Sequence, residues 1–223
     1  MLLYQFLVVL ILIPVSASIY IHYILYNTVN IWQVLMSFFC ALNTIISLWE
    51  IGLGLHITFI EREAKRLKEK YRGNRGAALL GFFVHPLNIS DAFTLKPWMI
   101  VWSTYSIYDP SYSNRESFGF FVDVGNGWST ILPTLAFWMS MSIDIFPLKF
   151  VLLISILTFY QEFYGTVIYI ASFVFNRRFT GLNFSEVYLF IGFANGLWIV
   201  FPLIGIYLCV AVLERNSFSI FRI

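Results

Sequence analysis

The chain has 223 residues, of which 59% are hydrophobic, 20% are aromatic and only 12% are charged. A water-soluble domain of this length could not bury so large an apolar share, so the composition excludes an ordinary soluble protein and predicts an integral membrane protein. The net charge of +2 is too small to indicate a nucleic-acid partner.

Five apolar segments are candidates to cross a bilayer, which takes about 20 mainly apolar residues. They cover residues 3–26, 33–60, 126–143, 148–174 and 188–212. We therefore predict one all-α membrane domain over residues 1–223, a bundle of five transmembrane helices around an intramembrane pocket.

Two of these segments need comment. The first resembles a signal peptide, because "VSASIY" is similar to a cleavage site, but it lacks a basic leading region, so a helix is predicted. The third mixes Gly, Asn, Ser, Thr and Pro into its span, which favours a position inside the bundle over one facing lipid.

The long connection over residues 61–125 is basic. It opens with "EREAKRLKEKYRGNR", predicted to be a solvated continuation of the second helix. The following "GAALLGFF" is too short to span and suits an interfacial or re-entrant turn. Of the 14 Lys and Arg residues, only Lys149, Arg215 and Arg222 fall on the opposite face, so the positive-inside rule predicts that the basic loop is cytosolic.

Two sequons on the basic face test this orientation. Asn88 opens Asn-Ile-Ser and Asn183 opens Asn-Phe-Ser, and only a lumenal face can be glycosylated.

Motifs of soluble enzymes and of cofactor binding are missing from the sequence. It contains no Gly-rich phosphate loop, no HExxH, no paired cysteines and no nucleophile elbow. His22, His56 and His85 lie on different segments, and Cys40 and Cys209 lie in apolar runs. We therefore expect no cofactor and no metal, and two cysteines that act as small buried hydrophobes.

The candidate functional groups are polar side chains at membrane depth, which are costly in hydrocarbon. Glu50 lies in mid-span, and Asn43, seven residues earlier, shares its helical face. Asp123 stands at the start of the third span. Two interpretations stay open for each acid: Glu50 is a functional acid or a protonated group bonded to a neighbouring helix, and Asp123 is functional or a helix cap.

The last two spans add further polar groups. The fourth contains "YQEFYGTVIY", in which Glu162 and Tyr169 share a face, and the fifth places Asn195 and Trp198 on one face at i and i+3. If these faces converge, they form an aromatic-walled pocket for a large apolar ligand.

Three sequence blocks carry a resemblance to a known family. "WSTYSIYDPSY" holds the skeleton W-x-x-Y-x-x-x-D-x-x-Y at Trp102, Tyr105, Asp109 and Tyr112. "ANGLWIVFP" and "EFYGTVIY" are similar to an Asn-x-x-Trp-x-x-x-Pro helix and a Gln-x-Tyr-Gly block. The chain, over about residues 40 to 210, resembles the emopamil-binding-protein family of EXPERA-domain membrane proteins, which includes sterol delta8-delta7 isomerases and the sigma-2 receptor type.

The resemblance implies a set of site residues. In the isomerases a His-x-x-x-Glu pair on the second helix and a Glu opening the third transfer protons; here these positions hold Ile46, Glu50 and Asp123. The histidine is absent and the second acid is one methylene shorter. The implied catalytic pair is thus Glu50 and Asp123. The implied substrate-binding residues are Trp102, Tyr105, Asp109, Tyr112, Glu162, Asn195 and Trp198.

Three functions follow as hypotheses. The first is a double-bond isomerase, or cyclase-type enzyme, acting on a sterol or related polycyclic isoprenoid through a carbocation. The second is a non-catalytic sterol- or lipid-binding protein of the same fold, since the histidine is missing. The third is an accessory subunit of a larger membrane complex. The expected partners are a sterol or other apolar polycyclic lipid, membrane lipid, and a second copy or a complex partner. The resemblance implies the endoplasmic-reticulum membrane.

Overall fold

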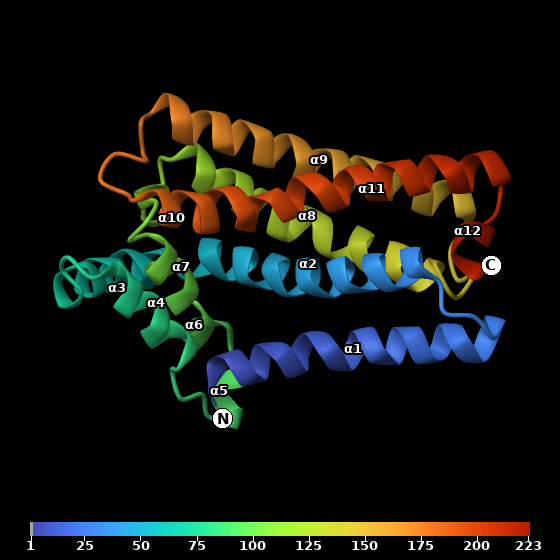
Figure 1. Cartoon of the computed structure of the whole chain (residues 1–223), viewed down its shortest axis with the longest axis horizontal. Coiled ribbons are helices and arrows are strands. Elements are labelled where there is room, and N and C mark those ends of the chain that lie inside the picture. The colour runs from blue at the N-terminus through green and yellow to red at the C-terminus, as the bar shows by residue number, and fades with distance from the viewer. Residues whose placement is uncertain (1) are drawn as a thin grey trace.

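The computed structural model describes residues 2–223, apart from the side chains of Ile89, Ala92 and Phe190. Within these residues the fold is helical, and the only extended pairing is an isolated bridge between Leu2 and Pro86. The long helices are α1 (Leu3–Tyr26), α2 (Ile31–Leu55), α8 (Phe118–Ser140), α9 (Leu148–Phe175) and α11 (Ala194–Arg215). They run side by side along the long axis, and the short helices gather at one end (Figure 1).

Four helical segments of residues 2–223 are long and apolar enough to cross a membrane, which indicates an integral membrane protein. They are α1, α2, α9 and the segment Phe184–Arg215. This last segment joins α10 (Phe184–Glu186), the π-helix η2 (Val187–Phe193) and α11. The fifth predicted span corresponds to α8, which has 23 residues but carries Gly, Asn, Ser, Thr and Pro and is less apolar.

Helix α8 packs against α2 and α9. Its contact with α2 is close at Gly127, where a Cβ would lie 2.7 Å from both the Ile51 backbone nitrogen and the Glu50 Cβ. Only glycine permits this approach, because any side chain would push the two helices apart. Helix α8 therefore lies at a fixed distance behind Glu50.

Two hydrogen bonds continue this α2–α8 contact toward the other end of the bundle. The hydroxyls of Ser47 and Thr130 lie 3.0 Å apart, and the Asn43 amide donates to the Thr134 hydroxyl at 3.0 Å. Because the helices run antiparallel, each residue one turn earlier on α2 meets one a turn later on α8. Polar side chains within the apolar spans are thus satisfied by each other.

The second predicted span, 33–60, is divided in the structure. Helix α2 ends at Leu55, and His56, with φ −121° and ψ 23°, separates it from α3 (Ile57–Lys70). Helix α3 is amphipathic, and its buried face packs against α7 and the 3₁₀ helix η1. The charged segment is therefore a helix as predicted, but it is not simply a solvated extension of α2.

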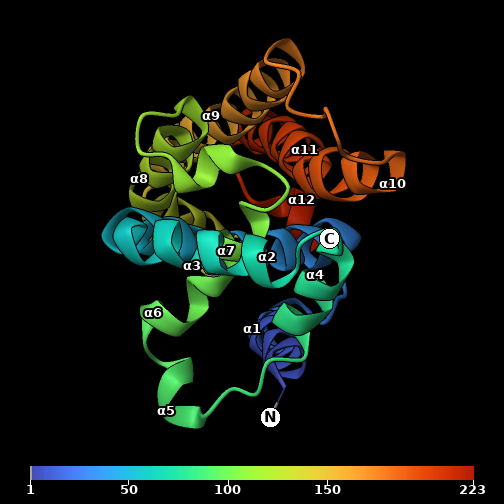
Figure 2. The same cartoon turned by 90° about the vertical axis from the view of Figure 1, so that its left-hand side faces the viewer.

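Short helices make up most of the predicted loop 61–125. After α3 come α4 (Arg75–Phe83), α5 (Ile89–Ala92), α6 (Leu95–Trp98), α7 (Ile100–Tyr105) and η1 (Pro110–Ser113). Figure 2 views this end of the molecule, where α3, α4 and α7 lie across the ends of the long helices. The segment "GAALLGFF" belongs to α4, which buries Ala78 and Phe82.

Helix α8 begins eight residues before the predicted position. Ser117 is its N-cap and accepts a hydrogen bond from the Phe120 backbone nitrogen at 3.1 Å. Asp123 therefore lies inside the helix, past the first turn. The interpretation of Asp123 as the helix cap was wrong, because the chain between η1 and α8 supplies a serine that occupies the cap position.

Candidate functional site

A cavity of about 160 Å³ lies among α2, α7, η1, α8, α9 and α11, at the end of the bundle covered by the short helices. We refer to it as the central cavity. Seven residues predicted for the site line it: Glu50, Trp102, Tyr105, Tyr112, Asp123, Asn195 and Trp198. The structure therefore brings together side chains that are up to about 150 positions apart in the sequence.

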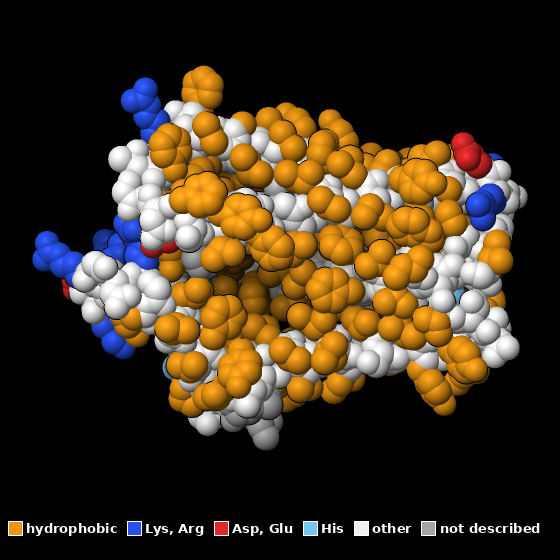
Figure 3. Space-filling model, viewed as in Figure 1, with side chains coloured by type: hydrophobic (Ala, Val, Ile, Leu, Met, Phe, Trp, Pro, Cys, Tyr) orange, Lys and Arg blue, Asp and Glu red, His pale blue; other side chains and the backbone are white. Residues whose placement is uncertain are grey.

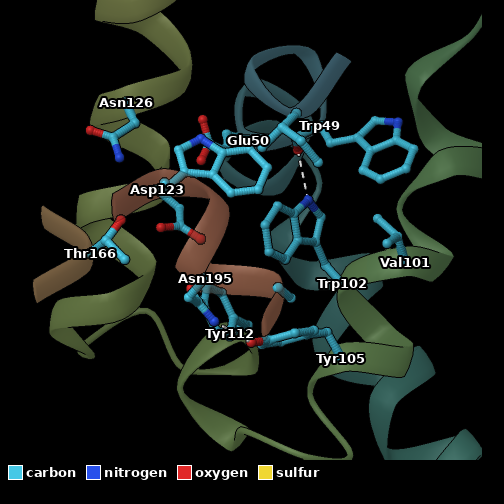
Figure 4. Close-up of a pocket in the computed structure, with 13 residues that line it drawn as sticks. Trp49, Glu50, Val101, Trp102, Tyr105, Tyr112, Asp123, Asn126, Thr166 and Asn195 are labelled. Carbon is cyan, nitrogen blue, oxygen red and sulfur yellow. Dashed lines mark hydrogen bonds between the residues drawn. The ribbon is translucent and has the colours of Figure 1, made fainter. Parts of the chain in front are cut away.

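The two predicted catalytic acids face the same cavity. Glu50 comes from α2 and is only 7% exposed, and Asp123 comes from α8 and is half-buried. Figure 4 shows Asp123, Asn126 and Thr166 on one side of the cavity and Val101, Trp102 and Tyr105 on the other. None of the ion pairs between described residues includes Glu50 or Asp123. Neither carboxyl is committed to a Lys or Arg, so both remain available for proton transfer.

Aromatic rings form the wall opposite the acids. Trp102 stacks on Tyr112 with ring centroids 5.2 Å apart, and Tyr105 meets Tyr112 edge-on at 5.0 Å. The Trp102 indole donates to the backbone oxygen of Trp49 at 2.8 Å, which fixes the ring against α2. Ring faces attract positive charge, so this wall can stabilise a cation in the cavity.

The phenols on this wall stay neutral hydroxyl groups. Burial raises the pKa of Tyr105 to about 12, and burial also holds the pKa of Tyr112 well above its ordinary value. They can therefore donate or accept hydrogen bonds in the cavity without adding charge to it.

Asn195 and Trp198 carry the cavity onto α11. The Asn195 amide donates to the Tyr105 hydroxyl at 3.3 Å and to the Ile191 backbone oxygen at 3.0 Å. That carbonyl belongs to η2, whose π-helical turns precede α11. Asn195 thus links α11 to α7 across the cavity, which explains a polar amide within an apolar span.

Glu162 lies outside the cavity wall. Its side chain is 1% exposed, and it accepts a hydrogen bond from the Asn43 amide at 2.6 Å. Asn43 in turn accepts from the Trp198 indole at 2.9 Å. Glu162 therefore supports the position of Trp198 through Asn43, and its placement does not support the substrate contact implied by the resemblance.

Asp109 likewise lies outside the cavity wall. It is fully buried, forms an ion pair with Arg178 at 2.8 Å, and accepts from the Tyr169 hydroxyl at 2.7 Å and the Ser111 backbone nitrogen at 3.0 Å. These bonds tie η1 to α9 and to the segment after it. Its geometry indicates a structural role beneath the Tyr112 ring rather than direct ligand contact.

Six further residues line the cavity without having been predicted as site residues. They are Ile46, Trp49, Val101, Asn126, Thr166 and Ala194. Helical spacing offered a signal for some of them, since Ile46 lies one turn before Glu50 and Asn126 one turn after Asp123. Val101 and Ala194 carry no such signal, because an apolar residue in an apolar chain does not announce a pocket.

No group of three or more His, Cys, Asp or Glu side chains in the described part of the chain is placed to hold a metal ion. The chemistry available to the cavity is therefore that of two carboxyls, an amide, hydroxyls and ring faces. Comparison with family models, with curated proteins and with solved structures finds no match to this chain.

Proposed function

We propose that this chain is a membrane enzyme that shifts a carbon–carbon double bond in a sterol or a related polycyclic isoprenoid by proton transfer. The observation that carries the proposal is that Glu50 and Asp123, from facing helices, line one buried cavity with an aromatic wall. The resemblance of the sequence to sterol isomerases supports the same chemistry.

The reaction needs one acid and one base. A protonated carboxyl adds its proton to one alkene carbon, so a new C–H bond forms and the neighbouring carbon becomes cationic. The other carboxyl, ionised, removes a proton from the next carbon, and that C–H electron pair becomes the new double bond. No oxidant or reductant is consumed, and the second carboxyl carries the proton that the first has lost.

The remaining cavity residues fit the needs of this pathway. The faces of Trp102 and Trp198 stabilise the intermediate cation, and the water-poor cavity protects it from capture by solvent. Asn195 and Tyr105 form a neutral hydrogen-bonding pair that can hold a hydroxyl at the polar end of the substrate.

A second function is favoured by one specific residue. Ile46 lines the cavity one turn from Glu50, where the resembled isomerases carry a histidine. Loss of that group removes a side chain that titrates near neutral pH. The alternative is therefore a sterol- or lipid-binding protein that has the cavity and does not catalyse the reaction.

We also propose that the protein resides in the endoplasmic-reticulum membrane with its basic end in the cytosol. Lys and Arg side chains gather at the end where α3 projects, while the opposite end carries few (Figure 3). Glycosylation of Asn88 or Asn183, both at the basic end, would reverse this orientation.

The function is tested with purified protein in lipid, a delta8-sterol and deuterated buffer. We expect an isomer of unchanged skeleton that has gained one deuterium, resolved by chromatography and mass spectrometry. Glu50→Gln and Asp123→Asn should each lower turnover by about 100-fold or more, the usual range for an acid–base group. Glu214→Gln, an exposed carboxyl at the far end of α11, is the matched control.

The outcomes separate the two functions. Turnover that survives in both acid variants would rule out the proposed mechanism. If the wild type gives no product but is thermally stabilised by the same sterol, the binding function replaces the enzyme. Unfolding temperatures of the variants, measured alongside, show whether a lost activity reflects chemistry or folding.

A further inference from the structure

A second cavity, of about 260 Å³, adjoins the central cavity. The two share Trp49, Val101 and Tyr105 as lining residues. The outer wall of the second cavity is formed by Leu7 of α1 and by Leu79, Phe82 and Phe83 of α4. We refer to it as the side cavity.

The side cavity offers almost nothing to a polar group. Of its polar side chains, Tyr108 donates its hydroxyl to the Arg75 backbone oxygen at 3.0 Å, and the Tyr105 hydroxyl is engaged by Asn195. The remaining wall is aliphatic and aromatic. Such a space favours hydrocarbon, because a polar ligand would lose its hydrogen bonds to water there without replacement.

The helices that form the outer wall are joined to each other. The Leu3 backbone nitrogen donates to the His85 oxygen at 3.0 Å, and Leu2 pairs with Pro86 directly after α4. The start of α1 is thus fixed to the end of α4, so the two sides of the side cavity are held together. In Figure 3 the apolar surface is hollowed near the end of the molecule where these elements lie.

The size of the central cavity gives a reason to consider both together. At about 160 Å³ it is close to an apolar cavity known to bind benzene, about 150 Å³. A polycyclic ligand needs more, since ligand pockets run from about 300 to 1,000 Å³. The side cavity, at about 260 Å³, brings the space around the shared wall into that range.

We propose that the side cavity binds the flexible hydrocarbon side chain of the substrate whose reacting ring occupies the central cavity. This inference rests on the proposed function and narrows its substrate class. The preferred substrate is a polycyclic isoprenoid that carries an aliphatic tail, and a tailless ring system is a poor one. The tail passes beside the shared wall of Trp49, Val101 and Tyr105, each of which is only partly buried.

The test compares two substrates that differ only in the tail. One is a delta8-sterol with its branched aliphatic side chain, and the other is the same delta8-tetracycle without it. Leu79→Trp and Leu7→Trp fill the side cavity from opposite helices. Ala17→Trp is the control, since Ala17 lines a separate cavity of about 310 Å³ between α1 and α8 that shares no lining residue with either.

We expect the wild type to prefer the tailed substrate in kcat/KM by about tenfold or more, since each methylene in an apolar pocket adds discrimination. Each filling variant should lose most of this preference while it processes the tailless substrate like the wild type. Thermal stabilisation by the two sterols should follow the same pattern, and the Ala17→Trp protein should behave as the wild type.

Two outcomes would overturn the inference. One is a wild type that turns over both substrates equally well. The other is a filling variant that keeps its preference, or that loses both substrates alike while its unfolding temperature is unchanged. The two variants come from different helices, so a folding defect in one leaves the other to decide. Turnover of the tailless substrate by the wild type reports separately on the proposed reaction.

Discussion

The two ends of the helix bundle are both rich in aromatic residues, but they use them differently. At the end away from the short helices, Phe39 stacks on Phe201 at 5.0 Å, and Phe137 meets Phe159 edge-on at 5.2 Å. This closed end also buries Met36, Cys40, Met141, Val151, Leu152, Leu208, Cys209 and Val212. At the cavity end, Trp49, Trp98 and Trp102 pack around open space instead.

The difference comes from what lies between the long helices. At the closed end they interdigitate directly, and the short C-terminal helix α12 (Ser219–Arg222) covers them with the buried Phe221. At the cavity end, α4, α6, α7 and η1 are inserted beside α2, and carboxyl and amide groups replace apolar contacts. Stability is thus expected to come mainly from the closed end, and chemistry from the other.

The largest stability effect should follow truncation in the closed core. Phe137 is fully buried and contacts both Phe159 and Phe221. Phe137→Ala should lower the free energy of unfolding by about 3–5 kcal/mol, because it leaves a large void. Sterol selectivity of the folded fraction should be unchanged. Denaturant unfolding in mixed micelles measures the first quantity, and a selectivity change would contradict the separation of the two ends.

A smaller effect that reaches both stability and the site is expected at Gly127. Gly127→Ala places a methyl group against the α2 backbone beside Glu50 and should cost about 1–3 kcal/mol through forced helix separation. Turnover should fall as well, since Glu50 moves relative to Asp123. Gly125→Ala on the same helix is the control, because its Cβ meets nothing within 4 Å. Equal behaviour of the two variants would refute the close-contact argument.

The Asn43 network at the border between the two ends should give an effect of similar or smaller size. Asn43→Leu removes the donor to Glu162 and the acceptor for the Trp198 indole, so buried polar atoms lose their partners at a cost of about 1–3 kcal/mol. Combining it with Glu162→Leu should recover part of that loss, because the orphaned carboxyl is then gone. A double-mutant cycle on unfolding free energies measures this coupling, and strict additivity would contradict it.

The smallest effect concerns pH and the closed end. The Arg222 guanidinium, bonded to Asp144 at 2.6 Å, lowers the pKa of that carboxyl below its ordinary value. The stabilisation is therefore present above the unfolded-state pKa of about 3.9 and is lost as the pH falls through the lower folded pKa. Because Asp144 is 68% exposed, the change should stay below about 1 kcal/mol.

The measurement is the unfolding temperature between about pH 6 and pH 3. Arg222→Gln should flatten the part of the profile that belongs to Asp144. A profile that is identical in the wild type and in Arg222→Gln would show that the pair adds nothing.

Much of the candidate site could be anticipated from the sequence because its members are unusual where they stand. A carboxyl such as Glu50 or an amide such as Asn195 in an apolar span is costly in hydrocarbon, and this cost makes it conspicuous. The same reasoning did not separate ligand-facing groups from structural ones. Asp109 and Glu162 are as conspicuous as Glu50, yet their partners, Arg178 and Asn43, lie far away in the sequence.

The sequence by itself determined the membrane class, the long helices and most polar residues worth examining, since apolar length and helical spacing are local properties. Only the tertiary structure decided that α8 begins at Phe118, that Glu50 and Asp123 share a cavity, and that a side cavity adjoins it. These features depend on which helix faces which, and helix packing is set by small steric matches such as Gly127 against α2. Such matches join distant positions, so they leave no periodic signal in the chain.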